Sequence, residues 1–124
     1  MKPPSKQPAI RMMMMPKDTN AVGSIFGGVI MSLIDQAAFV EASRQAPRKF
    51  VTIAMDKVEF HEPVHNGDIV SLWAETLKIG RSSIKLRVDV LARSRARNED
   101  LRVTSAEVTM VSIDDDGRPA PIFP

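Results

Sequence analysis

Two histidines and a glutamate stand close together in HEPVH, residues 61–65. The letters match H-E-x-x-H, a pattern in which two histidines one helical turn apart bind zinc beside a glutamate base. Here the segment follows an alternating apolar stretch that ends at Phe60, and Pro63 would break a helix at this point. We therefore predict a strand end and a turn without a metal, with polar side chains near solvent. A position of His61 at the border of a ligand cleft is the alternative.

Asp35 is a carboxylate in an otherwise apolar segment, IFGGVIMSLIDQAAFVEASRQ, residues 25–45. An unpaired carboxylate is costly to bury, so the face that carries Asp35 must meet solvent, a pocket or a partner. We place the polar stripe of Ser32, Gln36 and Ser43 at a different angle of the helix, which weakens the case for a merely solvated carboxylate. A general base in a half-buried cleft is the functional interpretation.

The pair Gly27-Gly28 falls where this helix is expected to begin, although glycine is a poor helix former. A tight entry turn or close packing on a sheet would explain the pair. So would a helix N-terminus whose free backbone N–H groups face an oxyanion, with the helix dipole adding to the attraction.

A second polar turn joins two alternating stretches and consists of Gly80, Arg81, Ser82 and Ser83. A plain hairpin turn is one interpretation. The exposed N–H groups, two hydroxyls and one guanidinium of this turn are also suited to a phosphate or an amide chain.

The elements that would carry these residues follow from composition and periodicity. Residues 1–9 are rich in Pro, Lys, Ser and Gln, which predicts a disordered segment. Residues 25–45 predict one helix that is capped by Asn20 or Ser24, ends before Pro47 and is buried on most sides. Apolar runs and period-two alternation predict strands, at residues 10–15, 50–60, 68–79, 82–94 and 101–113.

One α+β domain accounts for this order, β-α-β-β-β-β, with an antiparallel sheet of about five strands wrapped around one long central helix. We expect the last four strands to form a meander, whose first hairpin is closed by a turn that contains Asn66-Gly67. The domain spans residues 10–120, and residues 121–124 form a tail. The hot-dog fold has this arrangement.

Composition narrows the classes of function. The chain has 124 residues, of which 44% are hydrophobic and 26% charged, as in one globular domain. It has no cysteine, which excludes disulfides, thiolate metal sites and a cysteine nucleophile. The absence of a long apolar run and of a signal peptide predicts no membrane span and a cytoplasmic location. One Trp and no Tyr argue against nucleic acid as a partner.

The formal net charge is +2, and most of the basic excess lies in one tract, Arg93, Arg95, Arg97 and Arg102. This tract forms either a solvated loop or hairpin rim, or a contact to a phosphate-bearing ligand or partner.

The segment PKDTNAVGSIFGGVIMSLIDQAA, residues 16–38, resembles the signature of the bacterial acyl-CoA thioesterases of the hot-dog fold, D-T-N, then I-F-G-G, then I-M-x-x-x-D. The segments VTIAMDKVEFHEPVHNGDIV, KIGRSSIKLRVDV and VTSAEVTMVSIDDDGRP are similar to the later strands of that family. The resemblance covers about residues 10 to 120. It also accounts for HEPVH as the family's strand-end segment.

The resemblance implies an acyl-CoA thioesterase in which Asp35 acts as general base on water or as nucleophile on the thioester carbonyl. Asn20 would come from the facing subunit, and the N–H of Gly28, together with that of Gly27, would stabilise the oxyanion. No metal or cofactor is implied, because coenzyme A is part of the substrate and the leaving group. Further residues would contact the substrate or coenzyme A, with a lesser role for the Arg93–Arg97 region: Thr52, Ser32, Gly80, Arg81, Ser82, Ser83 and His61.

The family resemblance also implies a homo-oligomer, a dimer or a trimer of dimers, with two sites at each dimer interface. Two departures fall near the helix: Val29 stands where many relatives have Trp, and Ala37-Ala38 where many have Gly-Gly. Both departures would change the shape of the expected acyl pocket and therefore the acyl chain length that the protein prefers. A hot-dog hydratase or dehydratase using His61 and Glu62, and a non-catalytic acyl-CoA-binding protein, are the alternative functions.

Overall fold

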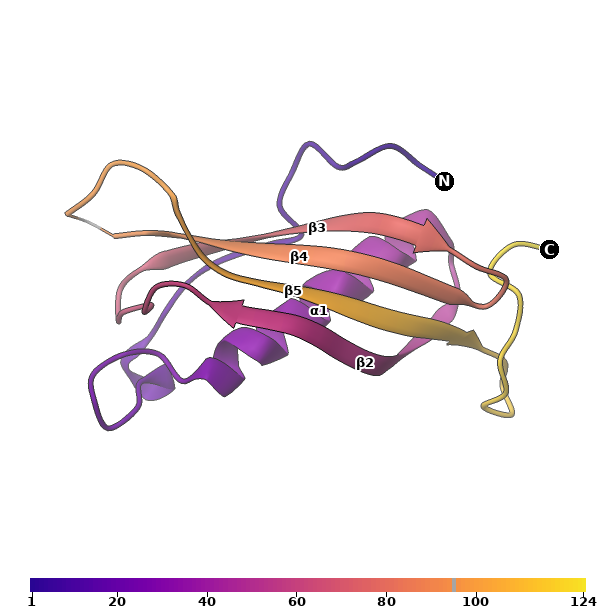
Figure 1. Cartoon of the computed structure of the whole chain (residues 1–124), viewed down its shortest axis with the longest axis horizontal. Helices are drawn as coiled ribbons and strands as arrows, with labels where there is room; N and C mark the ends of the chain where they lie inside the picture. Colours follow the sequence, from indigo (N-terminus) through magenta and orange to yellow (C-terminus); the bar gives the residue numbers. More distant parts are fainter. Residues whose placement is uncertain (95) are drawn as a thin grey trace.

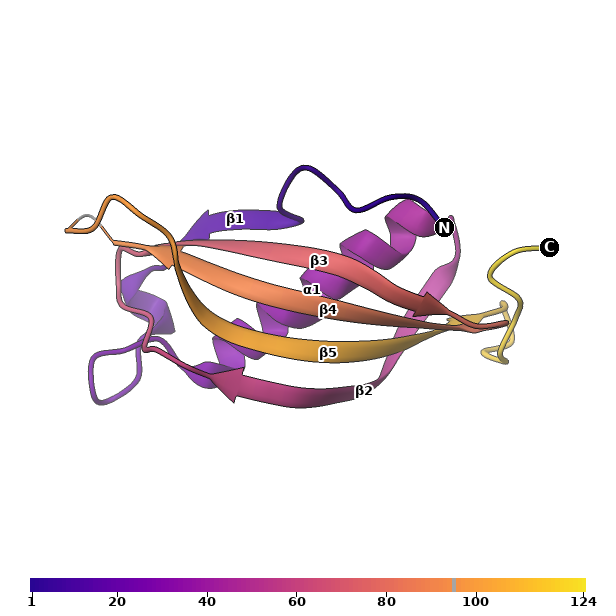
Figure 2. The same cartoon turned by 45° about the horizontal axis from the view of Figure 1, so that its top comes forward.

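The structure is a computed structural model that describes residues 1–94 and 96–124. Five strands form one antiparallel sheet in the order β1-β3-β4-β5-β2, and the helix α1 lies across one face of it (Figures 1 and 2). The predicted α+β class, with one sheet wrapped around one helix, is confirmed. In chain order the elements are β1 (Ile10–Met13), the 3-10 turn η1 (Pro16–Asp18), α1 (Gly27–Gln45), β2 (Lys49–Phe60), β3 (Ile69–Ile79), β4 (Ser83–Arg93) and β5 (Leu101–Ile113).

The predicted meander of the last four strands is wrong in one respect, because β2 pairs with β5 instead of β3. The Asn66-Gly67 turn does not close a hairpin between β2 and β3. It instead links the start of β3 to the end of β1, because the N–H of Gly67, just before β3, donates to the O of Met14, just after β1, at 2.9 Å. The segment between β2 and β3 crosses from one side of the sheet to the other, and the N–H of Ile25 donates to Val64 O at 2.8 Å on the way.

The core lies between α1 and the inner face of the sheet. Alternate residues of β4, from Ile84 to Val90, are fully buried beneath the helix, as the period-two pattern predicts. Their partners on α1 are small or branched apolar side chains that recur along one side of the helix. These are Ile30, Leu33, Ile34, Ala37, Ala38 and Ala42.

The other side of α1 is open, which corrects the expectation of a helix buried on most sides. Its exposed stripe includes Met31, Ser32, Gln36 and Phe39, with half-buried Asp35 among them. Asp35 therefore shares a face with the polar stripe instead of lying at a different angle. The sequence of α1 is almost continuously apolar for two reasons. The sheet covers one side of the helix, and exposed apolar residues occupy part of the other side.

The helix begins at Gly27 without a side-chain cap, so the expected cap from Asn20 or Ser24 is also wrong. Phe26 holds the cap position, and its carbonyl oxygen accepts from the N–H of Val29 at 3.0 Å. The chain enters the helix through a loop whose polar side chains bind one another instead.

A buried polar network fastens the end of α1. The carboxylate of Glu41 accepts hydrogen bonds from Arg44 Nε at 2.7 Å, Thr76 Oγ1 at 2.7 Å and Gln45 Nε2 at 3.1 Å. Burial alone raises the pKa of Glu41, but the hydrogen bonds from Arg44, Thr76 and Gln45 outweigh it and hold the pKa below its ordinary value. The network joins the helix to β3.

Replacing Glu41 by glutamine should lower stability by about 1–3 kcal/mol at pH 7, because the buried donors of Gln45 and Thr76 and the half-buried guanidinium of Arg44 lose their charged acceptor. A depressed pKa stabilises the fold above the unfolded value, about 4.3, and the contribution is lost as the pH falls through the folded value. The difference in melting temperature between wild type and Glu41→Gln should therefore narrow as the pH falls below about 4. Glu75→Gln, at an exposed position on β3, is the control; a gap that persists unchanged at pH 3 would contradict the assignment.

Both termini run along the domain without helix or strand of their own. The N–H of Lys2 donates to Gln45 Oε1 at 2.7 Å, and Arg44 donates to Pro3 O at 2.8 Å. Ile122 is buried, and its N–H donates to Arg81 O at 2.9 Å. The division into residues 1–9, 10–120 and 121–124 remains a prediction.

Candidate active site

Asp35 and Thr52 meet between α1 and β2. Thr52 Oγ1 donates to Asp35 Oδ1 at 2.5 Å, which orients the carboxylate and leaves Oδ2 available. The register of β2 with β5 shifts directly after Thr52, and such bulges re-aim side chains next to functional sites. The structure thus brings together two of the residues expected at the site.

The surroundings of this pair are apolar and open. Asp35 and Thr52 border a hollow of about 530 Å³ whose other walls include Phe39, Val40 and Phe50. Beside it runs β2, an edge strand of the sheet with Ile53 61% exposed. An edge strand with exposed apolar side chains is a surface for pairing with another chain. The half-buried carboxylate therefore stands beside a surface suited to a partner.

Gly27 and Gly28 form the first turn of α1, as expected. A side-chain carbon on Gly27 would come within 3.3 Å of the ring of Phe60, so close packing accounts for this glycine. Such a carbon on Gly28 would meet nothing within 4 Å. Among the described residues, neither backbone N–H finds an acceptor, as is usual for the first turn of a helix. Both donors are therefore free for an oxyanion.

Gly28 and Asp35 are too far apart to act on the same atom within one chain. They are seven residues apart on one helix, which corresponds to about 10 Å along its axis. A base and an oxyanion donor must each lie about 3 Å from a reacting group. Within one chain, the Asp35 carboxylate and the free N–H groups of Gly27 and Gly28 are therefore two separated halves of the candidate site.

Asn20 stabilises its own loop. Its Oδ1 accepts from the N–H groups of Val22 at 3.0 Å and Ser24 at 3.1 Å, and its Nδ2 donates to Ser24 Oγ at 3.0 Å. One Nδ2 hydrogen remains unused in these contacts. The loop leads into the first turn of α1, at the end of the helix where Gly27 and Gly28 lie.

The remaining expected binding residues lie apart from one another. Ser32 is exposed on α1 and accepts from Gln36 Nε2 at 3.3 Å. The turn of residues 80–83 lies at the end of the sheet opposite the start of α1 (Figures 1 and 2). It is a tight hairpin, in which the N–H of Gly80 donates to Ser83 O at 2.8 Å, and Arg81 at its tip is exposed.

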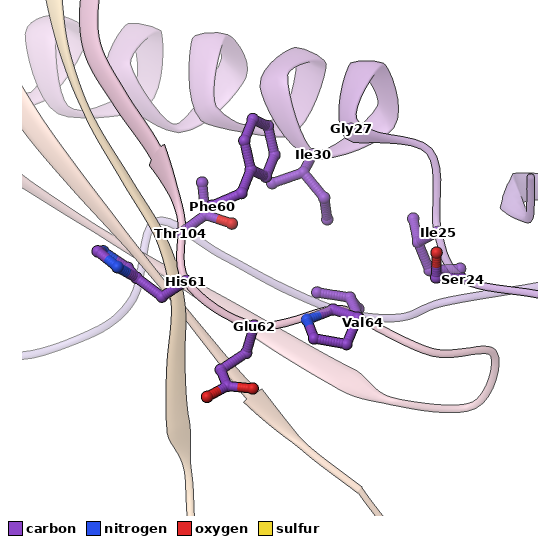
Figure 3. Close-up of a pocket in the computed structure, with 10 residues that line it drawn as sticks. Ser24, Ile25, Gly27, Ile30, Phe60, His61, Glu62, Val64 and Thr104 are labelled. Atoms are coloured by element: carbon purple, nitrogen blue, oxygen red, sulfur yellow. The ribbon is translucent and has the colours of Figure 1, made fainter. Parts of the chain in front are cut away.

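The HEPVH segment follows the end of β2 and is not helical, which confirms the predicted strand end. Its two imidazoles face different carboxylates: His61 Nε2 lies 3.6 Å from Glu59 Oε2, and His65 Nδ1 lies 4.0 Å from Asp68 Oδ2. Within residues 1–94 and 96–124, no three metal-ligating side chains converge. His61 lies at the rim of a pocket near the start of α1, with its ring directed away from the pocket (Figure 3).

The basic tract is partly engaged in contacts. Arg93 Nε lies 3.2 Å from Asp100 Oδ1, Arg102 Nε lies 3.3 Å from Asp89 Oδ1, and Arg97 donates to Ala92 O at 3.3 Å. Arg95 lies outside the described residues. The part of the chain that the structure describes has no helix long and apolar enough to cross a membrane.

Sequence reasoning missed several polar residues that the fold buries, among them Glu41 and Thr104. A signal for these two was present in the pattern. Thr104 follows the same period-two register as Ala106 and Val108 on the inner face of β5, and Glu41 lies one helical turn from buried Ala37 and Ala38.

A single antiparallel sheet wrapped around one helix defines a hot-dog domain. The chain belongs to the Thioesterase superfamily, whose sequence pattern matches residues 22–99. An uncharacterized acyl-CoA thioester hydrolase of Zymomonas mobilis is 44% identical over 121 residues, which cover 98% of this chain and 81% of the relative. The acyl-CoA thioester hydrolase YciA of Salmonella typhimurium is 34% identical, with 96% and 92% covered.

Solved structures of similar proteins are also hot-dog fold thioesterases or thioesterases. A hexameric hot-dog fold thioesterase of Campylobacter jejuni has a TM-score of 0.88 and 43% identity, with 94% of this chain and 90% of that chain covered. A hexameric thioesterase of Yersinia pestis has a TM-score of 0.90 and 36% identity, with 98% of each chain covered. The predicted family and fold are confirmed.

Proposed function

We propose that this protein hydrolyses an acyl-CoA thioester to a free carboxylic acid and coenzyme A. The observation that carries the proposal is the Asp35 carboxylate, held by Thr52 at 2.5 Å on the open face of α1. Membership of the Thioesterase superfamily supports it, as do relatives named acyl-CoA thioester hydrolases.

The working site is formed by two chains. Because Gly28 and Asp35 of one chain are about 10 Å apart along the helix, Asp35 acts with Gly28 of the partner subunit. Two antiparallel helices related by a twofold axis bring residue 28 of each beside residue 35 of the other, which gives two equal sites. The open face of α1 and the free edge of β2 are the surfaces that support this pairing.

In the general-base route, Asp35 takes a proton from a water molecule while the water oxygen attacks the thioester carbonyl carbon. The carbonyl oxygen becomes an oxyanion that accepts from the N–H of Gly28 of the partner subunit, at the positive end of its helix. The C–S bond then breaks, and the proton passes to the sulfur of coenzyme A. Direct attack by the carboxylate is the other route open to Asp35.

Neither route needs a metal or a cofactor, since coenzyme A enters with the substrate and leaves as a product. Asn20, beside the glycine half of the site, orients the carbonyl or the water through its unused Nδ2 hydrogen. The turn of residues 80–83 contacts the pantetheine or phosphate part of coenzyme A, supplied from another subunit. A trimer of dimers would bring these parts together, and the hexameric solved neighbours support that assembly. A cytoplasmic location remains the expectation from composition.

Release of free thiol tests the function directly. With acyl-CoAs from acetyl to palmitoyl and several aryl-CoAs, we expect at least one series to release coenzyme A thiol with the wild-type protein. A hydratase would change enoyl or hydroxyacyl thioesters without releasing thiol, and a binding protein would raise its melting temperature with acyl-CoA without turnover. Either of those results would overturn the proposed activity.

A further inference from the structure

A pocket of about 370 Å³ opens beside the first turn of α1 (Figure 3). Its walls are mainly apolar and come from three parts of the chain: Ile25 and Ile30 around the helix start, Phe60 and Val64 at the end of β2 and beyond, and Thr104 on β5. The volume is near the lower end of the range for ligand pockets, roughly 300–1,000 Å³. A pocket of this size suits a compact group better than a long chain.

Thr104 is the one fully buried polar residue among the residues that line this pocket. The residue is 0% exposed, and its Oγ1 has no hydrogen-bond partner among the described residues. In Figure 3 this oxygen points toward the space between Ile30 and Val64. A buried hydroxyl without a partner destabilises a fold, whereas valine has nearly the same shape without that penalty. An oxygen atom of a ligand in the pocket would supply the partner that this hydroxyl lacks.

The pocket adjoins the oxyanion half of the proposed site, because Gly27 belongs both to its wall and to the first turn of α1. A thioester carbonyl bound at the free N–H groups of this turn would direct its acyl group toward the pocket. Two other hollows lie nearby, one beside Asp35 that is bounded by Phe39 and Val40, and one of about 330 Å³ that is bounded by Gly28, Val29 and Ser32. A partner subunit would cover Phe39 and Val40 in the proposed dimer. Of these three hollows, only the pocket at the helix start is lined by a buried hydroxyl that has no hydrogen-bond partner among the described residues.

We propose that this pocket receives the acyl group and that Thr104 Oγ1 hydrogen-bonds an oxygen substituent on it. The substrates are compact acyl-CoAs that carry a hydroxyl or keto oxygen beyond the thioester. A neutral oxygen is favoured over a carboxylate, because the described lining residues include Glu62 but no lysine or arginine. This inference rests on the proposed thioesterase function and specifies its substrate class.

The test compares kcat/KM for 3-hydroxybutanoyl-CoA and butanoyl-CoA. The wild type should prefer the hydroxyacyl substrate, and Thr104→Val should lower that preference by roughly three- to tenfold, the effect of one neutral hydrogen bond. Thr104→Ser, which keeps the hydroxyl, should retain it. Thr104→Val should also raise the melting temperature, because it removes an unpaired buried hydroxyl.

Ser112 provides a matched control. It is another buried hydroxyl on β5 without a partner in the described chain, and it lies eight residues farther along, about 27 Å from Thr104. Ser112→Ala should raise stability in the same way and leave the substrate preference unchanged.

The possible outcomes separate this inference from the proposed function. Hydrolysis of both substrates with a preference that Thr104→Val does not change would overturn the role of Thr104 and leave the thioesterase intact. A preference lost equally in Ser112→Ala would assign the effect to the strand as a whole and would also overturn it. Absence of thiol release from both substrates in the wild type would overturn the proposed function and this inference together.

Discussion

Replacing Asp35 by asparagine is expected to lower kcat/KM for acyl-CoA hydrolysis by about 10²- to 10⁴-fold, the usual contribution of a positioned base. The amide keeps the shape of the side chain and can still accept from Thr52 Oγ1, but it can neither take a proton from water nor attack a carbonyl. Asp35 is only half-buried on the open face of α1, so the fold should persist. The measurement is free-thiol release, with circular dichroism and melting temperature recorded on the same samples.

Two further variants show whether the loss is specific to the site. Asp116→Asn makes the same chemical change in an exposed turn and should leave the rate unchanged. Thr52→Val removes the 2.5 Å hydrogen bond to Asp35 and should lower kcat by roughly three- to tenfold with little change in KM. A normal rate for Asp35→Asn would remove this carboxylate from the mechanism.

Replacing Ile53 by lysine is expected to abolish both assembly and activity. Ile53 is 61% exposed on the free edge of β2, and the proposed dimer buries it. A lysine there would place an unpaired charge in the interface, which costs several kcal/mol. At micromolar concentration the variant should lose the dimer contact and sediment as a smaller species than the wild type, and kcat/KM should fall at least about 100-fold, because the base and the oxyanion donors come from different chains.

Met13 provides the matched control, since it is a similarly exposed apolar residue on the other edge strand, β1. Met13→Lys should keep the dimer and its activity. A monomeric Ile53→Lys protein with full activity would show that one chain holds a complete site, contrary to the proposal.

Mixing two inactive variants tests the shared site independently. Asp35→Asn lacks the base, and Gly28→Pro lacks one oxyanion N–H at a position in the first helical turn where proline is tolerated. With free subunit exchange about half of the dimers are mixed, and each mixed dimer has one intact site, so about a quarter of the wild-type rate should return. No recovery after confirmed exchange would place base and donor in one chain.

Local patterns predicted the elements well because they depend on neighbours in the sequence. The alternating segments became β2 to β5 with ends within about two residues of the expected ones, and the glycine pair did mark the start of α1. Pro63 kept HEPVH from being helical, as a missing N–H and a fixed φ require. The prediction of a meander was wrong because contacts across the sheet decide which strands pair. The turn at Asn66-Gly67 is compatible with more than one partner for β2.

The amino-acid sequence was enough to predict the fold class and the family and to identify the residues able to do chemistry, above all Asp35 and Gly28, because side-chain chemistry and periodicity are properties of the chain. Which of these residues meet became clear from the folded structure alone. It placed Thr52 on Asp35, opened the face of α1 that looked buried, and left Thr104 without a partner in a pocket wall. The physical reason is that burial and hydrogen-bond partners depend on which elements cover one another, and residues 17 or 31 positions apart come together only when the chain folds.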